Sequence, residues 1–394
     1  MSEIKVPKGY KQTEVGVIPE DWEVTTIGEF SPLQRGFDLP TTKVQPGNYP
    51  VVYSNGALRT HKYFQVQGPG IVTGRSGTIG KVHYIENDFW PHNTSLWVTN
   101  FGDAHVKYVY YLFQKIGFER FKSGSGVPTL NRNDAHSYKI AVPNNVNEQT
   151  AIANALTDTD NLIQSLEKLI AKKEAIKTGT MQQLLTGKTR LPEFATREDG
   201  SPKGFKQTEL GKIPEDWNVK YMSSLGSFGR GRVISNNEIS KSISKLYPVY
   251  SSQTSNQGIM GYLDSYDFEG EYITWTTDGV NAGKVFYRNG KFNCTNVCGV
   301  IKIDRDIPSY IALAMDRVAR RYVSTNLANP KLMNGEAKKI QVLVPTLLKE
   351  QTAIATILSD MDAEIEALQD RLEKTKAIKQ GMMQQLLTGK VRLV

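Results

Sequence analysis

Two long stretches of the chain distribute apolar and polar residues with the period of an amphipathic helix. Mostly apolar positions recur there at alternating steps of four and three, which is the seam of a coiled coil. The seam positions are Ile152, Leu156, Thr159, Ile163, Leu166 and Ile170, and then Ile354, Leu358, Met361, Ile365, Leu368 and Leu372. Neither Pro nor Gly interrupts the pattern before Gly179 and Gly381. Each stretch therefore predicts a helix of about 30 residues, or about 45 Å.

Short runs of β-branched and aromatic residues, separated by Gly, Pro and Asn, occupy the regions before and between these helices. This pattern is typical of strands. The runs lie at 49–53, 70–73, 81–85 and 95–99, and again at 247–250, 271–276, 284–287 and 297–303. A helix is predicted after each set, at 106–121 and 308–323, and an apolar strand ending in Pro closes each region, at 139–143 and 341–345. We therefore expect an α+β fold with two strand-rich α/β domains.

The chain contains the same two blocks twice. Residues 8–24 (KGYKQTEVGVIPEDWEV) recur with few changes at 203–219, and residues 148–191 recur at 350–393. Because the order is A-B-A-B, we expect a pseudo-twofold repeat whose two long helices pack as an antiparallel coiled coil. The predicted boundaries are 1–147 and 203–349 for the strand-rich domains, 148–190 and 350–394 for the helical spacers, and 191–202 for a polar linker.

The net charge follows these boundaries. The chain carries +8 in total, with +3 over 1–147, −1 over 148–200, +7 over 201–349 and −1 over 350–394. Basic domains suit a polyanion such as nucleic acid, whereas near-neutral helices suit pairing with each other. A basic surface that serves only solubility is the alternative. No apolar run is long enough for a signal peptide or a membrane span, so we expect a cytoplasmic protein without a membrane partner.

Several residues that suggest chemistry have simpler explanations. Cys294 and Cys298 are the two cysteines of the chain, and all five histidines lie in the other domain, so we expect structural thiols and no metal site. Trp22 and Trp217 lie in the repeated block, where a buried anchor is favoured over a base-stacking role. The GKT at 187–189 ends a helix and does not follow a strand, which excludes a phosphate-binding loop.

The alternation of variable strand-rich domains with repeated helices resembles the specificity subunits of type I restriction–modification systems. The IPEDW segments at 18–22 and 213–217 look like the start of a target recognition domain in that family. GRSGTIGKV at 74–82 looks like its Gly-rich motif, and VPTLNRNDAHSYKIAVP at 127–143 looks like the junction with its helix. In the second domain WTTDGVNAGKV at 275–285 replaces the Gly-rich motif, so that only its final Gly-Lys-Val corresponds.

The resemblance implies a non-catalytic subunit with two target recognition domains that each read half of an asymmetric, bipartite double-stranded DNA target. The helices would set the spacing and dock two modification subunits, which would bring S-adenosylmethionine for adenine methylation. Restriction subunits would add cleavage that depends on ATP and Mg²⁺. This chain would bind none of these cofactors and would have no catalytic residue. Two alternatives stay open: a self-contained DNA methyltransferase or nuclease with diverged motifs, and a coiled-coil structural adaptor.

Polar side chains in the turns of both domains are the predicted DNA contacts. Arg is the usual partner of guanine, and Asn or Gln that of adenine, while Lys, Ser and Thr contact phosphates. The candidates in the first domain are Ser54, Asn55, Arg59, Arg75, Ser76, Thr78, Lys81 and Asn131. Those in the second domain are Arg230, Arg232, Gln253, Asn256, Thr277, Asn281 and Lys284. For any single candidate, a solvated turn position is the alternative.

The repeated MQQLLTGK segments end the two predicted helices. Gly187 and Gly389 are predicted helix stops. The segments either cap the helices only or also dock the modification subunits. The residues predicted for docking are Gln182, Gln183, Leu184 and Leu185, and Gln384, Gln385, Leu386 and Leu387.

Overall fold

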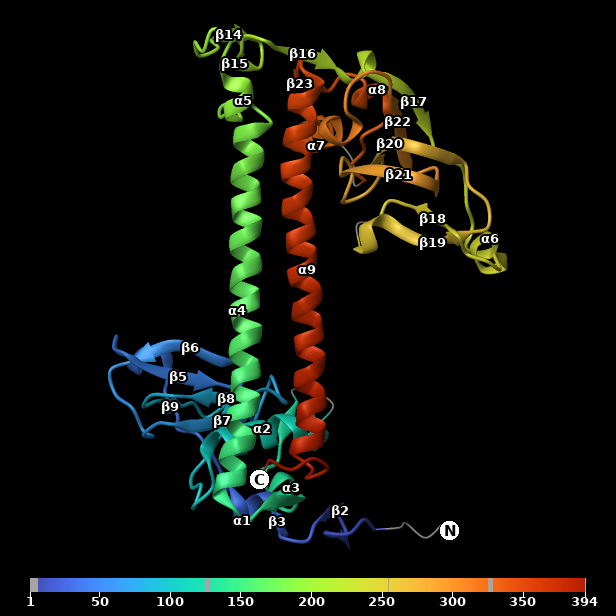
Figure 1. Ribbon diagram of the computed structural model, residues 1–394. Helices are drawn as coiled ribbons and strands as arrows, with labels where there is room; N and C mark the ends of the chain where they lie inside the picture. The colour runs from blue at the N-terminus through green and yellow to red at the C-terminus, as the bar shows by residue number, and fades with distance from the viewer. Residues whose placement is uncertain (1–5, 125–127, 254, 325–328, 394) are drawn as a thin grey trace. The chain divides into compact units, whose positions relative to one another are not determined.

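The computed structural model of the protein describes residues 6–124, 128–253, 255–324 and 329–393 (Figure 1). The chain divides into two compact units. Unit 1 comprises residues 1–168 and 368–394, and unit 2 comprises residues 169–367. Each unit therefore combines one strand-rich domain with the adjoining parts of both long helices.

The two long helices are α4 (Val146–Leu184) and α9 (Leu348–Leu386), each of 39 residues. A helix of that length spans about 58 Å, so the predicted length of about 45 Å is too short. Both helices continue through Gly179 and Gly381 and end three residues before the predicted stops at Gly187 and Gly389. An interior glycine costs only about 0.5–1 kcal/mol, which the surrounding helix-forming residues offset.

Within each unit, α4 and α9 pack antiparallel. In unit 1, Asp160 pairs with Lys379 at 2.7 Å and Glu167 pairs with Lys376 at 3.5 Å, so the residue number rises on α4 as it falls on α9. In unit 2, Lys173 pairs with Glu364 at 2.6 Å. The predicted seam is confirmed, because its positions are buried or half-buried in the described helices.

The strand-rich domain of unit 1 contains one sheet in the order β4-β10-β7-β8 and a second in the order β6-β5-β9. The strands are β4 (Leu33–Arg35), β5 (Tyr49–Tyr53), β6 (Gly56–His61), β7 (Gly70–Gly74), β8 (Val82–Ile85), β9 (Trp90–Pro91) and β10 (Ser95–Val98). Shorter pairs surround them: β1 (Tyr10–Thr13) with β2 (Gly16–Pro19), β3 (Trp22–Thr26) with β13 (Lys139–Pro143), and β11 (Lys122–Ser123) with β12 (Thr129–Leu130). The helices are α1 (Ile27–Phe30), α2 (Val106–Ile116) and α3 (Arg132–His136), with 3₁₀ turns η1 (Thr41–Lys43) and η2 (Phe118–Phe121).

The strand-rich domain of unit 2 contains a single sheet in the order β17-β22-β20-β21-β18-β19. The strands are β17 (Gly226–Arg230), β18 (Tyr247–Tyr250), β19 (Ile259–Leu263), β20 (Phe268–Thr276), β21 (Val285–Cys294) and β22 (Cys298–Ile303). Two further pairs are β14 (Phe205–Thr208) with β15 (Gly211–Pro214), and β16 (Trp217–Tyr221) with β23 (Gln341–Pro345). The helices are α5 (Pro192–Ala195), α6 (Asn236–Lys241), α7 (Pro308–Ala319) and α8 (Asn334–Ala337), with 3₁₀ turns η3 (Met222–Ser224), η4 (Ser255–Gly258) and η5 (Arg320–Tyr322).

The two domains share one topology although their sequences differ. In unit 2 the long strand β21 pairs antiparallel with β20 and parallel with β18. In unit 1 two short strands divide this role, because β8 pairs antiparallel with β7 and β9 pairs parallel with β5. The strand orders of the two units therefore correspond, from β4 and β17 at one edge to β6 and β19 at the other.

Each hydrophobic core joins a domain to the helices. In unit 1, Ile152 and Leu156 of α4 pack with Trp22, which is 1% exposed. In unit 2, Ile354 of α9 packs with Trp217, which is 0% exposed. The prediction that both tryptophans are buried anchors is confirmed. No described helix combines the length and the apolar character needed to cross a membrane.

The predicted linker, residues 191–202, is structured. It contains α5 and an isolated bridge between Thr196 and Pro202. Arg197 also pairs with Glu215 at 2.7 Å. The polar residues of this linker supply hydrogen bonds that hold it against the rest of unit 2.

Candidate nucleic-acid interface

Three segments of unit 1 that are far apart in sequence meet around the Gly-rich motif. The backbone N–H groups of Arg75 and Ser76 donate to the carbonyl of Thr94 at 2.9 and 3.1 Å. The N–H of Gly77 donates to Pro128 at 3.0 Å, and the N–H of Leu130 donates to Arg75 at 2.8 Å. We call residues 54–55, 74–81 and 128–131 the loop cluster of unit 1.

The turn between β5 and β6 belongs to the same cluster. A side chain added at Gly77, which has φ +83°, would place its Cβ 3.8 Å from the Ser54 hydroxyl. The turn packs closely against the His83 side chain, because a Cβ added at Gly56 would lie 3.3 Å from the His83 ring. Ser54 and Asn55 are therefore held beside the Gly-rich motif.

Unit 2 builds the same cluster with the same backbone hydrogen bonds. The N–H of Gly279 donates to Pro330 at 3.0 Å, and that of Leu332 donates to Thr277 at 2.9 Å. Ser76 bridges Thr129 in unit 1, and Asp278 bridges Lys331 in unit 2. The loop cluster of unit 2 comprises residues 251–253, 255–258, 276–284 and 329–332.

The two clusters have matching backbones and different side chains. All of the matched positions are 202 residues apart, which is also the offset between the helical repeats. Glycine, proline and leucine recur where the backbone requires them, at 77, 128 and 130 and at 279, 330 and 332. The side chains at the neighbouring matched positions are unlike: Arg75 and Thr277, Ser76 and Asp278, Thr129 and Lys331, Asn131 and Met333.

The structure brings most of the unit 1 candidates together. The candidates on the loop cluster are Ser54, Asn55, Arg75, Ser76, Thr78, Lys81 and Asn131, while Arg59 lies on β6. Asn55, Arg59, Lys81 and Asn131 are exposed, whereas Ser54 is buried. Asn131 also caps α3, because its side-chain oxygen accepts from the N–H of Asn133 at 3.0 Å. Val127, in the predicted junction motif, lies outside the described residues.

Three unit 2 candidates have surroundings that the sequence did not reveal. Thr277 is 0% exposed, so it cannot contact DNA directly. Arg232 pairs with Glu238 at 2.7 Å and with Asp267 at 2.9 Å. Lys284 pairs with Asp316 of α7 at 2.9 Å. In these two cases carboxylates from neighbouring segments pair with the predicted cations. Both side chains stay partly exposed, 41% for Arg232 and 47% for Lys284, so their contact with DNA stays a prediction.

The remaining unit 2 candidates lie on or beside the loop cluster. Arg230 donates through its Nε to the Asn296 carbonyl and lies 3.9 Å from the Asp278 carboxylate. Gln253 donates its side-chain amide to the Ile259 carbonyl. Asn256 is exposed, and Asn281 lines an open cavity of about 370 Å³ together with Lys284, Asp316 and Arg320.

A buried arginine supports the turn between β18 and β19, which is longer than its counterpart in unit 1. Arg288 of β21 is 6% exposed, and its guanidinium lies 3.6 Å from the ring centre of Tyr250 and 4.3 Å from that of Phe286. It donates to the carbonyl of Gln257 at 2.7 Å. Burial lowers the pKa of Arg288. The residue thus fixes the turn that presents Asn256.

Asp278, Lys331 and Thr129 were missed by the sequence analysis. The offset of 202 between Gly77 and Gly279 would have aligned the two clusters and identified them. The sequence analysis instead aligned the two motifs on the Gly-Lys-Val at their ends. That alignment is shifted by one position, because unit 2 has one more residue between Gly279 and Gly283 than unit 1 has between Gly77 and Gly80.

The helix ends are attached to the domains of their own unit. Leu184 and Leu185 are buried in the core of unit 2, and Leu386 and Leu387 in that of unit 1. These four leucines are therefore unavailable to a partner, which corrects that part of the docking prediction. The four glutamines at 182, 183, 384 and 385 are exposed, and docking through them stays a prediction.

The predicted stops have the expected backbone conformation. Gly187 has φ +66° and Gly389 has φ +69°. Each packs on the IPEDW segment of its unit, since a Cβ would lie 2.5 Å from Pro214 at Gly187 and 2.5 Å from Pro19 at Gly389. The glycines thus serve both as helix stops and as close contacts with the domain.

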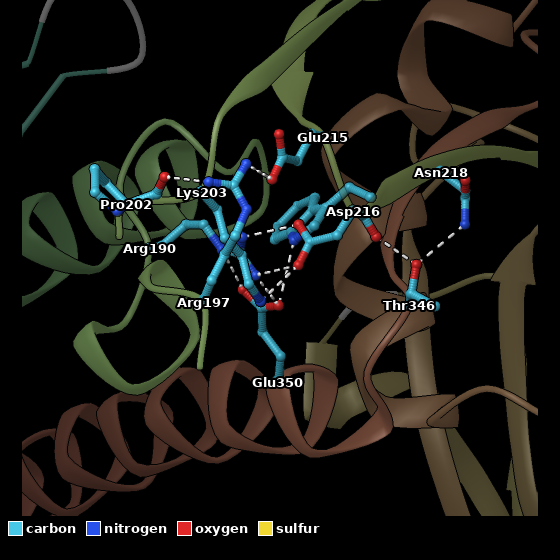
Figure 2. A network of polar contacts seen from close by, with 10 residues as sticks. Arg190, Arg197, Pro202, Lys203, Glu215, Asp216, Asn218, Thr346 and Glu350 are labelled. Atoms are coloured by element: carbon cyan, nitrogen blue, oxygen red, sulfur yellow. Dashed lines mark hydrogen bonds and ion pairs between the residues drawn. The ribbon is translucent and has the colours of Figure 1, made fainter. Parts of the chain in front are cut away.

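A buried polar cluster fastens each helix end, and Figure 2 shows the one in unit 2. Arg190 donates to Glu350 at 2.6 and 2.9 Å and to Asp216 at 2.8 and 3.1 Å. Glu350, which is 1% exposed, also accepts from the indole of Trp217 at 3.3 Å, and Lys203 donates to Asp216 at 2.8 Å. We call these five residues the arginine clamp of unit 2.

Unit 1 repeats the arrangement with Arg392, Glu148, Asp21 and Trp22. Arg392 donates to both Asp21 oxygens at 2.8 Å and to Glu148 at 2.8 Å. Glu148 accepts from the Trp22 indole at 3.2 Å. In each unit the clamp joins the end of one long helix, the start of the other and the IPEDW segment.

The sequence matches the family model of the type I restriction modification DNA specificity domain twice, over residues 19–177 and 214–377. The chain belongs to this family. The two matches each cover one strand-rich domain and most of the helix that follows it.

Relatives from one organism match in part of the chain. A Mycoplasma pneumoniae protein named "Putative type I specificity subunit S.MpnORF289P N-terminus" is 48% identical over 131 residues, 33% of this chain and 69% of that protein. The type I restriction enzyme MpnII specificity subunit of the same organism is 42% identical over 113 residues, 28% of this chain and 34% of that protein. The crystal structure of a type I restriction-modification system S subunit from M. genitalium has the same fold, with a TM-score of 0.68 at 16% identity over 97% of this chain and 98% of that one.

Proposed function

We propose that the chain is the DNA-sequence specificity subunit of a type I restriction–modification complex. Each loop cluster contacts one half of a bipartite double-stranded target, and α4 and α9 set the gap between the halves. The observation that carries the proposal is the pair of matching backbones with unlike side chains. One protein surface built twice, with different polar groups at equivalent positions, suits two different half-sites.

Charge supports a nucleic-acid partner. The net charges of +3 and +7 lie on the segments that contain the loop clusters, and each helical segment carries −1. In unit 1, Arg59 of β6 and Lys81 of the loop cluster are exposed. Cations that contact phosphates release counterions, so affinity must fall as salt rises.

In this proposal the chain supplies binding and the catalytic groups come from other subunits. Two modification subunits dock on the helices and carry S-adenosylmethionine, and restriction subunits carry ATP and Mg²⁺. The exposed glutamines at the two helix ends are candidate docking residues.

The test is footprinting of the chain assembled with its modification subunits. We expect two short protected stretches of different sequence separated by an unprotected gap. Replacing residues 220–349 with the matching region of a relative should change one stretch and leave the other intact. A folded, assembled complex that protects no discrete site would refute the proposal.

The same preparation distinguishes the alternatives. Methyl transfer to DNA by the purified chain alone, supplied with S-adenosylmethionine, would favour a self-contained methyltransferase. DNA binding that does not weaken between 50 and 200 mM salt would favour a structural adaptor, because about tenfold or greater weakening is expected even from a few phosphate contacts.

A further inference from the structure

A carboxylate lies at the centre of the unit 2 loop cluster, where the expected partner is an anion. Asp278 occupies the position that Ser76 holds in unit 1, beside the Gly279 turn. Its side chain is 21% exposed, so it is accessible at the surface of the cluster. An acidic residue there repels phosphates, and its presence needs a physical reason.

The surroundings of Asp278 hold the carboxylate in one orientation. The hydroxyl of Thr277, which is completely buried, donates to the Asp278 Oδ2 at 2.6 Å. Lys331 lies 3.6 Å from Oδ1, and Arg230 lies 3.9 Å from Oδ2. Arg230 is itself fixed, because its Nε donates to the Asn296 carbonyl.

The two cations also offset the repulsion that DNA would cause. Both are partly exposed, with side-chain exposures of 41% for Lys331 and 42% for Arg230, so they can reach phosphates while they flank the carboxylate. An ionised carboxylate only accepts hydrogen bonds. In the major groove it therefore suits a base edge that carries an amino group, and cytosine N4 is the usual partner of Asp.

We propose that Asp278 is a specificity-determining residue that accepts a hydrogen bond from the amino group of one base, cytosine in the first instance, in the half-site contacted by unit 2. Thr277 is the positioning residue that orients the carboxylate, and Lys331 and Arg230 contact the adjoining phosphates. The carboxylate also rejects guanine and thymine at that position, because their major-groove oxygens are acceptors. This inference rests on the proposed function.

The test measures base preference with the assembled specificity and modification subunits. A DNA pool in which each target position is randomised is selected by binding, and the retained sequences are counted. Asp278→Asn, which keeps the side-chain size and adds a donor, should reduce discrimination about 10- to 100-fold at one base pair of one half-site. The other half-site should be unchanged.

Two further variants make the result specific. Thr277→Val removes only the hydroxyl that orients the carboxylate, and it should weaken discrimination at the same base pair by a smaller factor. Glu269→Gln makes the same chemical change near the start of β20, whereas Asp278 follows the end of that strand, and it should leave both half-sites unchanged. Glu269 is exposed, pairs with Lys291 at 3.6 Å and accepts a hydrogen bond from the Tyr266 hydroxyl at 3.1 Å.

The outcomes separate this inference from the proposed function. A wild-type complex that selects no bipartite sequence would refute the proposed function, and this inference with it. A wild-type complex that selects a bipartite sequence, with Asp278→Asn and Thr277→Val both leaving it unaltered, would overturn only the role of Asp278. Altered preference in the other half-site would overturn the assignment of Asp278 to one half-site.

Discussion

Removing Arg190 should destabilise unit 2 strongly and locally. The Arg190 side chain is 6% exposed, and it pairs with Glu350, whose side chain is 1% exposed. Arg190→Ala would leave that carboxylate buried without its cation, with only the Trp217 indole as a remaining donor among the described contacts. Breaking a buried ion pair by removing one partner costs about 3–5 kcal/mol.

The matched control is Arg197→Ala in the same network (Figure 2). Arg197 is 47% exposed and pairs with Glu215, which is 36% exposed. Exposed ion pairs contribute about 0–1 kcal/mol, so this variant should differ little from the wild type. Arg190→Ala combined with Glu350→Gln should recover part of the loss, since the unpaired buried charge is then removed.

The assay must distinguish the two units, because a chain with more than one compact unit need not unfold in a single step. Hydrogen exchange read peptide by peptide provides the free energy of opening for each unit. We expect Arg190→Ala to lower it by about 3–5 kcal/mol around β16 and the start of α9, with peptides of the unit 1 domain unchanged. A loss below about 1 kcal/mol, or an equal loss in both units, would refute the importance of the clamp.

The clamp also predicts an acid dependence. Although burial raises the pKa of Asp216, hydrogen bonds from Lys203 and Arg190 outweigh that effect and hold the pKa below its ordinary value. A carboxylate whose pKa is lower in the folded state stabilises the fold fully above its unfolded pKa, about 3.9, and loses this contribution as the pH falls through the folded pKa. The denaturant concentration at the unfolding midpoint of unit 2 should therefore decrease as the pH is lowered below about 4 in the wild type. In Arg190→Ala it should decrease less steeply with pH. Equal slopes would argue against the ion pair.

Two further predictions use pairs of equivalent or similar residues, and urea unfolding monitored by circular dichroism measures both. Gly187→Ala should destabilise the fold by more than about 1–2 kcal/mol, because the backbone there is left-handed and the new Cβ would lie 2.5 Å from Pro214. Gly179 lies within α4 with open space around it, so Gly179→Ala should stabilise the fold by about 0.5–1 kcal/mol. Tyr310→Phe removes a buried hydroxyl that donates to a backbone carbonyl at 2.9 Å, and it should lower the stability by about 0.5–1.5 kcal/mol. The Tyr108 hydroxyl is buried without a hydrogen-bond partner among the described residues, so Tyr108→Phe should be neutral or stabilising. Effects of the same sign within either pair would contradict the reasoning.

The helices and the buried anchors could be predicted from sequence because local pattern determines them. A seam such as Leu166 and Ile170 becomes buried whenever two such helices pair, whatever surrounds them. The predicted strands match β5, β7, β18 and β23 closely for the same reason. Their order in the sheet was not predictable, because it depends on contacts such as that between Val249 and Asn293, which no local pattern encodes.

The surroundings of the site residues were predicted less well, because they depend on groups that are distant in the sequence. Which carboxylate pairs with a surface cation is one example, since Asp316 pairs with Lys284 from 32 residues away. Burial had the same effect on Thr277, which a turn-like sequence placed at the surface. In unit 1 the corresponding loops contain few acids, and the exposed candidates Arg59 and Lys81 have no carboxylate partner among the described residues.

The arginine clamps and the loop clusters both occur in each unit, but different physical constraints act on their side chains. The clamp residues are alike in the two units because Glu148 and Glu350 are nearly completely buried, and a buried carboxylate without its arginine and indole partners is costly. Ser76 and Asp278 differ because their environment is only partly enclosed and the backbone hydrogen bonds around them do not involve the side chain. Under the proposed function, the residues that differ between equivalent positions on this shared backbone are therefore the candidates for distinguishing one DNA half-site from the other.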